Sequence, residues 1–268
     1  DRALAMAHML LKQARVSGDP RDEVMARRAL GSSVFMLGDF LEARKHLALA
    51  AYQDSGMWPG ESFAIHPSIA ARLLLGWTLW MLGFPDAALF DVRAALGAAQ
   101  GIGHPYTVAS AHFMASMVHT LREEFDEALD HADKSLVLSR QHDLKHYRIY
   151  SGVVRGCALA GLGRRTEGLA LIREGLKVTR QGNLRHMQGF MLAWLAHVSL
   201  EGGITSARGW RWMRCSVISV PLRRTSGWQS CIVFMVNFCW RRIPRLLVQP
   251  RTLFLLLWIW PGARQRKP

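Results

Sequence analysis

The sequence predicts an all-α fold in which pairs of helices stack into a superhelix. The first observation is a recurring pattern, in which Leu-Gly ends an apolar run, a small residue follows, and an amphipathic run begins. It occurs at 36–50 (MLGDFLEARKHLALA), 82–96, 121–136 and 162–176, and it starts again at 200–209. The second observation is the helical spacing of apolar residues within each run. Because a two-helix unit cannot bury its apolar stripe alone, a repeat of this length predicts a helical solenoid of about five pairs.

The third observation is the regular position of the small residues. The residue at the close-packing position is Ala43, Ala88, Ala128, Gly168 and Gly209, at spacings of 45, 40, 40 and 41 residues. A small side chain there lets two helices approach closely, and a bulky one would overpack the contact. The full set of expected repeat anchors is Gly31, Gly38, Ala43, Gly76, Gly83, Ala88, Ala128, Gly156, Gly163, Gly168 and Gly209.

Periodicity and turn residues give the expected elements in order. Pro20 suits the first turn of a helix, and Gly38-Asp39 and Gly182-Asn183 suit turns. A longer link over 54–67 contains two Gly and two Pro. Helices are expected over 3–16, 21–37, 40–53, 68–82, 85–100, 106–121, 125–141, 145–162, 166–181 and 184–200.

Charge divides the chain into two parts. Residues 1–203 hold 22 Lys+Arg and 20 Asp+Glu, whereas residues 204–268 hold 12 Lys+Arg and no acid. The second part also carries 6 of the 10 Trp and 3 of the 4 Cys. The expected domains are therefore a repeat domain over 1–209 and a basic, poorly ordered tail over 210–268. Neither apolar run of the tail reaches the roughly 20 residues of a spanning helix, so no membrane span is expected.

Within each unit, the spacing resembles the tetratricopeptide repeat, a right-handed α-α superhelix. Leu30-Gly31, Val34, Gly38, Ala43, Leu47 and Ala50 fall where that family places its large, small, aromatic, turn-glycine, small, aromatic and small residues, in that order. Aliphatic residues replace the aromatic ones, and the period exceeds the ~34 residues of the standard unit.

A closer resemblance is to the long repeat region that follows the ATPase module in bacterial adenylate/guanylate cyclase-like proteins. It is carried by 27–52 (RRALGSSVFMLGDFLEARKHLALAAY), 73–89, 101–129 and 155–176. The resemblance implies a protein-interaction or sensor arm of a larger cytoplasmic signalling protein, of which this chain is a fragment. The ATPase and cyclase motifs themselves do not occur in the sequence, so no catalysis and no cofactor is expected of this chain.

The break after Gly209 suggests a reading-frame error or a frameshift. Reading the back-translated tail from the third base of each codon permits LALDEVLGHLG after Gly209, in which acids and helical spacing return. The alternative is a freestanding helical-repeat protein whose basic, Trp-rich tail docks on membrane or nucleic acid. If the tail is read in the wrong frame, its positive charge gives no information about partners, and no nucleic-acid partner is expected.

The histidines and acidic residues that could bind a metal or act in catalysis are interpreted as structural. The expected place of His104, His112, His119, His131, His142 and His146 is at turns and on the surface, and no metal site is expected. The acidic stretch 123–127 (EEFDE) is expected to be the solvated start of a helix.

The remaining candidate surface is the concave groove, which the first helix of each pair lines in tetratricopeptide repeats. An apolar groove with one Arg suits an amphipathic helix or an extended apolar peptide. Some of its residues could equally pack in the core. By the register of the resemblance, the candidate groove residues are Met25, Arg28, Phe35, Met36, Leu73, Trp77, Trp80, Phe113 and Met117.

Overall fold

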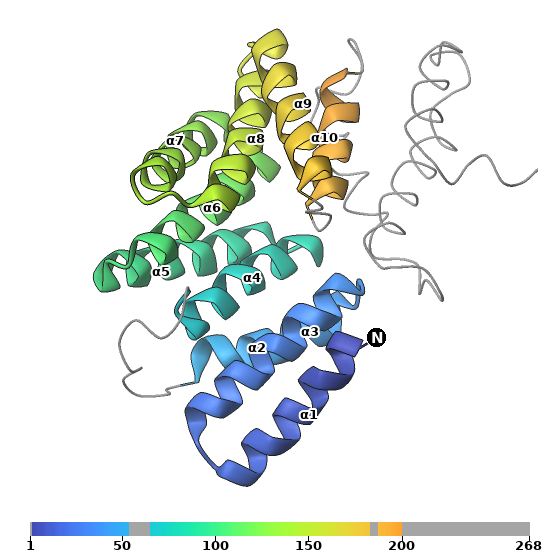
Figure 1. Ribbon diagram of the computed structural model, residues 1–268, viewed down its shortest axis with the longest axis vertical. Helices are drawn as coiled ribbons and strands as arrows, with labels where there is room; N and C mark the ends of the chain where they lie inside the picture. The colour runs from blue at the N-terminus through green and yellow to red at the C-terminus, as the bar shows by residue number, and fades with distance from the viewer. Residues whose placement is uncertain (1, 54–64, 183–186, 200–268) are drawn as a thin grey trace, which may run out of the picture.

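The computed structural model describes residues 2–53, 65–182 and 187–199, and this described part is all-α without strands. Its helices follow one another up the molecule from α1 to α9 and α10 (Figure 1). The predicted fold class is thereby confirmed. The helices are α1 (Arg2–Ser17), α2 (Pro20–Met36), α3 (Phe40–Tyr52), α4 (Pro67–Met81), α5 (Pro85–Ile102), α6 (Pro105–Leu121), α7 (Phe125–Gln141), α8 (Lys145–Gly161), α9 (Arg165–Gln181) and α10 (Gln188–Ser199).

The helices pack as consecutive pairs. Four complete pairs are described, namely α2/α3, α4/α5, α6/α7 and α8/α9, with α1 before them and α10 after them. Each helix packs on the next, and the first helices of neighbouring pairs also contact one another, as in α2 with α4 and α6 with α8. The core is therefore continuous along the stack. Gly209, the tail over 210–268 and the frameshift hypothesis lie outside the described residues.

The same turn joins the two helices of every complete pair. Gly38, Gly83 and Gly163 adopt φ angles of 87°, 90° and 85°. This left-handed conformation ends a helix, and glycine adopts it without steric cost. The next residue donates its backbone N–H to a carbonyl five residues earlier, in the pairs Asp39–Val34, Phe84–Leu79, Glu124–His119 and Arg164–Leu159. In the third pair Glu123 takes the glycine position with φ 64°, so a side chain is held in a conformation that costs about 1 kcal/mol.

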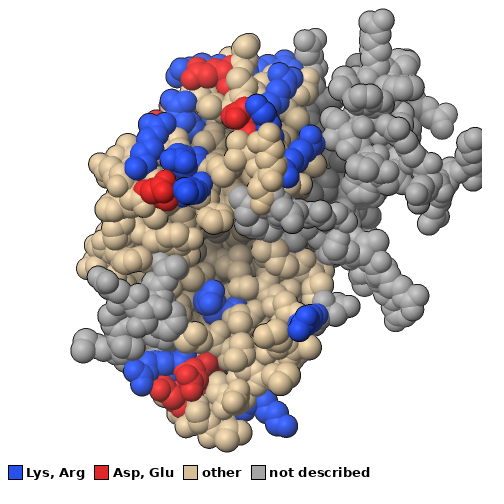
Figure 2. All heavy atoms as spheres, in the orientation of Figure 1, with Lys and Arg blue, Asp and Glu red and all other residues tan. Residues whose placement is uncertain are grey.

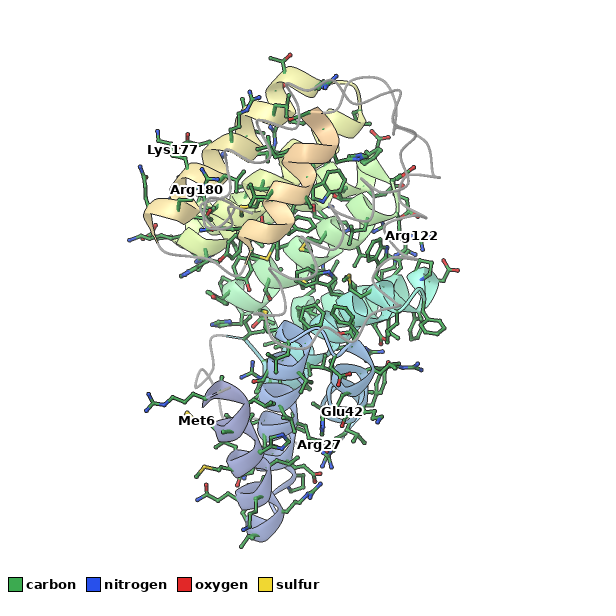
Figure 3. The ribbon with its side chains drawn as sticks, turned by 90° about the vertical axis from the view of Figure 1, so that its right-hand side faces the viewer. Met6, Arg27, Glu42, Arg122, Lys177 and Arg180 are labelled. Atoms are coloured by element: carbon green, nitrogen blue, oxygen red, sulfur yellow. The ribbon has the colours of Figure 1, made fainter. Side chains whose placement is uncertain are left out.

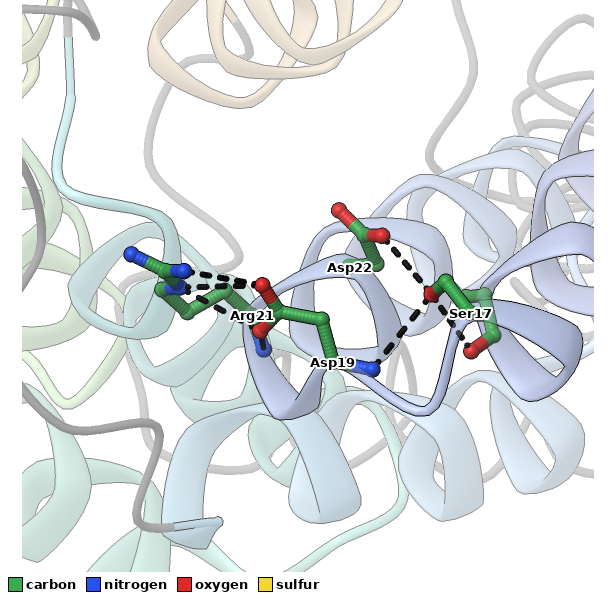
Figure 4. A network of polar contacts seen from close by, with 5 residues as sticks. Ser17, Asp19, Arg21 and Asp22 are labelled. Carbon is green, nitrogen blue, oxygen red and sulfur yellow. Dashed lines mark hydrogen bonds and ion pairs between the residues drawn. The ribbon is translucent and has the colours of Figure 1, made fainter.

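A polar network closes the turn between α1 and α2 (Figure 4). The Asp19 carboxylate accepts from the backbone N–H of Arg21 at 2.8 Å and pairs with the Arg21 guanidinium at 2.9 Å. Ser17 Oγ donates to Asp22 Oδ2 at 2.8 Å. These contacts satisfy free donors at the start of α2, which is where capping residues stabilise helices. Proline stands in the first turn of four helices, as Pro20, Pro67, Pro85 and Pro105.

Glycine in the first helix of a pair permits close contact with the second helix. A Cβ at Gly31 would lie 2.7 Å from Leu47 Cγ, and one at Gly76 would lie 2.5 Å from Val92 Cγ2. A Cβ at Gly156 would lie 2.8 Å from the carbonyl oxygen of Gly168. On the second helices Ala43, Ala88 and Ala128 are fully buried. The small residues that set the repeat therefore lie at the contact between the two helices of each pair.

Candidate functional site

The structure places six of the nine candidate groove residues in the hydrophobic core. Only three, Met25, Arg28 and Met36, are half-buried. The first helices pack closely against their neighbours, so a face that could line a groove is instead covered by the next pair. The six core residues are Phe35, Leu73, Trp77, Trp80, Phe113 and Met117.

Aromatic contacts bring this face together across the stack. The rings of Phe35 in α2 and Trp77 in α4 have centroids 5.1 Å apart. Trp77 also meets Phe190 of α10 edge-on, with centroids 6.3 Å apart. The last described helix therefore reaches the second pair as well as its neighbours α8 and α9. This contact helps to explain why Trp77 is only 7% exposed.

Arg28 is the cation of the candidate groove. Its Nε is buried and makes no hydrogen bond, and burial lowers the pKa of its guanidinium. Met25, Arg28 and Met36 share one face of α2 by helical spacing. The neighbouring Arg27, by contrast, is paired with Glu23 and lies where Figure 3 labels it, on the lower part of the stack. A guanidinium nitrogen that is buried without a hydrogen bond costs free energy unless an anionic or polar group approaches it.

A second cluster joins α6 and α7 through three histidines. His112 Nδ1 and His131 Nδ1 are 3.0 Å apart, a distance at which one ring donates a hydrogen bond to the other. The rings of His119 and His131 are stacked with centroids 5.4 Å apart. His119 Nδ1 lies 2.6 Å from Glu124 Oε2.

The expectation of surface histidines is therefore wrong for His112 and His119, which are 6% and 2% exposed. Their spacing of seven residues puts both on the face of α6 that packs against α7. The prediction of a solvated acidic helix start is confirmed at Asp126 and Glu127, which are exposed in the first turn of α7, whereas Glu124 belongs to the cluster. Its side chain is 32% exposed and is held by both His119 and the Nε of Arg122, the latter at 2.7 Å.

The electrostatics of this cluster favour neutral rings. Burial, reinforced by the neighbouring His112 and His119, lowers the pKa of His131 to about 4. Burial also lowers the pKa of His112, with Lys134 adding to the effect and Asp130 opposing it. His131 is therefore uncharged at neutral pH and takes up its proton only on acidification. Within residues 2–53, 65–182 and 187–199, no group of three or more His, Cys, Asp or Glu has the arrangement of a metal site.

Sequence reasoning missed the pairing of His112 with His131, although the signal was present. The two residues are 19 positions apart. Arg72 and Asp91 in the preceding pair are also 19 apart and are joined by a hydrogen bond of 3.0 Å. Aligning the pairs on their small residues would have placed both contacts at the same point of the repeat.

Charged side chains on the visible face gather over its two ends. Figure 2 shows Lys, Arg, Asp and Glu over the upper helices and over the lowest ones, with a mostly uncharged surface and a hollow between them. Cys157 is free and buried, and burial raises the pKa of its thiol, so it is not an accessible nucleophile.

The fold and these sites define the class of the chain as an all-α helical-repeat protein. No protein-family model matches the chain, and no curated protein matches it. Among the described residues, no helix is both long enough and apolar enough to cross a membrane.

Proposed function

We propose that the chain is a protein-interaction scaffold, serving as the sensor arm of a larger signalling protein of the adenylate/guanylate cyclase–ATPase type. The observation that carries the proposal is the half-buried Arg28, whose buried Nε lacks a hydrogen bond on a face that it shares with Met25. Helical-repeat scaffolds present such faces to partner helices. An amphipathic helix would cover Met25 and offer a polar group to the guanidinium.

Partner binding would act through the packing of the stack. Each pair contacts its neighbours, so a helix bound along α2 would favour one arrangement of neighbouring pairs over another. In the parent protein, this change would bias the ATPase or cyclase module. The link to that family is supported by the sequence resemblance, and a cytoplasmic place follows from the same resemblance.

Two experiments test the proposal. Sequencing the gene upstream of the Asp1 codon and across the Gly209 codon should show an ATPase or cyclase module and a second frame that continues the repeat. A continuous upstream frame that encodes neither module would refute the signalling assignment. In the complete gene product, replacing Arg28 with Met should abolish regulation by the partner while the fold is retained, and unchanged regulation would refute the role of this face.

A further inference from the structure

A polar contact between the two helices of a pair recurs at one point of the repeat. In the second pair, Arg72 of α4 donates to Asp91 of α5 at 3.0 Å. Asp91 also accepts from Tyr52 of α3 at 2.6 Å, and the Arg72 guanidinium lies over the Tyr52 ring. These three side chains fill the groove between the second helices α3 and α5, above the first helix α4.

The third pair fills the same position in another way. His112 and His131 stand forty residues after Arg72 and Asp91, and they also contact each other, at 3.0 Å. His112 is 6% exposed, so little open space remains between the helices there. A large side chain on the first helix thus closes the groove in both pairs.

The fourth pair has no such side chain. Forty residues after His112 and His131, the register places Gly152 and Leu171. A cavity of about 640 Å³ opens there between α7 and α9, with α8 as its floor. Gly152 lines it, and its aliphatic walls are Leu136, Val137, Ile149, Leu171 and Val178.

Packing does not require a glycine at position 152. A Cβ built there would have no atom within 4 Å, whereas one at Gly156, a turn later, would lie 2.8 Å from the carbonyl oxygen of Gly168. Gly152 also lacks a positive φ angle. A glycine inside a helix costs about 1 kcal/mol relative to alanine. The effect of Gly152 on the structure is therefore to keep this cavity open.

One end of the cavity is basic. Because α8 runs antiparallel to α7 and α9, the end of α7, the start of α8 and the end of α9 lie together. Arg140 and Arg148 line the cavity at this end, and Figure 3 shows Lys177 and Arg180 projecting from α9 close to each other. Asp143, in the turn before α8, is 70% exposed and forms a long ion pair of 3.7 Å with Arg148.

The other charges of the cavity are partly neutralised or exposed. Arg155 Nε lies 2.7 Å from Asp133 Oδ1, so this pair leaves little net charge. Glu174 is exposed on α9. Within the described part of the chain, no ion pair is found for Arg140. An entering carboxylate would therefore meet Arg140 at the basic end, with Arg148 and its exposed partner Asp143 beside it.

We propose that this groove binds an acidic peptide segment of a partner protein. The segment inserts an aliphatic side chain over Gly152 and places a carboxylate against Arg140 and Arg148. The bound side chain takes the place that Arg72 and His112 fill in the preceding pairs. The inference rests on the proposed function, because it requires that the chain act through a protein partner.

The test uses the full chain and two fluorescein-labelled synthetic peptides, one of alternating Glu and Leu and one with Gln in place of Glu. Fluorescence anisotropy measures their binding. Gly152→Leu fills the cavity, and Gly97→Leu is the matched control, because Gly97 is exposed on α5 and a Cβ there also meets nothing within 4 Å. Both substitutions improve helix propensity, so both variants should fold.

The Glu/Leu peptide should bind the wild-type chain and the Gly97→Leu variant equally. Its affinity should fall about tenfold for Gly152→Leu and severalfold for Arg140→Gln. The Gln/Leu peptide should bind weakly to all of them. Equal binding to the two leucine variants, or no binding to the wild-type chain, would overturn the proposal. The gene sequence decides the signalling assignment separately, so failure of one is not failure of the other.

Discussion

Acidification should weaken the contact between α6 and α7 through His131, and replacing this residue with Asn should remove the effect. An Asn amide reaches the position of the imidazole Nδ1 and can keep the hydrogen bond to His112, now 3.0 Å long. Asn and His have similar helix propensities. The variant therefore removes the titrating group with little change in packing.

The magnitude follows from the pKa of His131, which burial and the neighbouring histidines lower from 6.5 to about 4. The unfolded chain binds this proton at a higher pH than the folded chain, so the free energy of unfolding falls as the pH drops from about 6.5 to about 4. Each pKa unit corresponds to about 1.4 kcal/mol, which gives about 3 kcal/mol in full. Because His131 is only half-buried, solvent screening reduces the expected loss to about 2 kcal/mol.

Urea unfolding followed by circular dichroism, at several pH values from about 7 to about 4, measures this loss. Because other ionisable groups of the chain also contribute to its pH dependence, the informative quantity is the difference between the wild-type chain and His131→Asn. That difference should grow by about 2 kcal/mol in favour of the variant as the pH falls. His142→Asn, at the exposed C-cap of the same helix, is the matched control for the change of side chain. Parallel curves for wild type and His131→Asn would refute the reasoning.

Four further substitutions give distinct outcomes. Gly156→Val should lower the free energy of unfolding by about 1–3 kcal/mol, because its Cβ would meet a backbone carbonyl at 2.8 Å; an unchanged urea midpoint would contradict this close contact. Glu123→Gly should raise it by about 1 kcal/mol by relieving a φ of 64°, and a lowered melting temperature would argue against strain there. Arg28→Met should raise the free energy of unfolding by about 1 kcal/mol, since a half-buried guanidinium whose Nε has no hydrogen bond is removed; a lower urea midpoint would show that the guanidinium is satisfied within the fold. Trp77→Ala should lower the free energy of unfolding by about 3–5 kcal/mol, because Trp77 is a core residue. Retained stability in the same assay would show that Trp77 lines the groove instead.

The helices were predictable because strong local signals mark their ends. Pro20 begins α2, and Gly38 and Gly83 end first helices in the left-handed conformation. Most helix bounds consequently agree with the sequence prediction within two residues. The turn at Glu123 carries no glycine, yet it has the same conformation, because the neighbouring pairs impose the same geometry on it.

The candidate groove was harder to predict because helical periodicity identifies an apolar face without identifying what covers it. From the sequence, Trp77 could face a partner or the next helix. Its contacts with Phe35 and Phe190 show that it packs in the core. The histidine cluster was missed for a related reason. The register between α6 and α7, and not the spacing within α6, brings His112 to His131.

The contact between Trp77 and Phe190 has a consequence for how the chain unfolds. In a linear repeat array each unit interacts with its neighbours alone, so terminal helices fray without disturbing the middle. Here Phe190 of α10 packs on Trp77 of α4, two pairs away from its neighbours α8 and α9. Opening of α10 uncovers the second pair, and backbone amides of α4 and α10 should exchange hydrogen for deuterium in a shared event. The stack then unfolds as a cooperative unit rather than from its end inward.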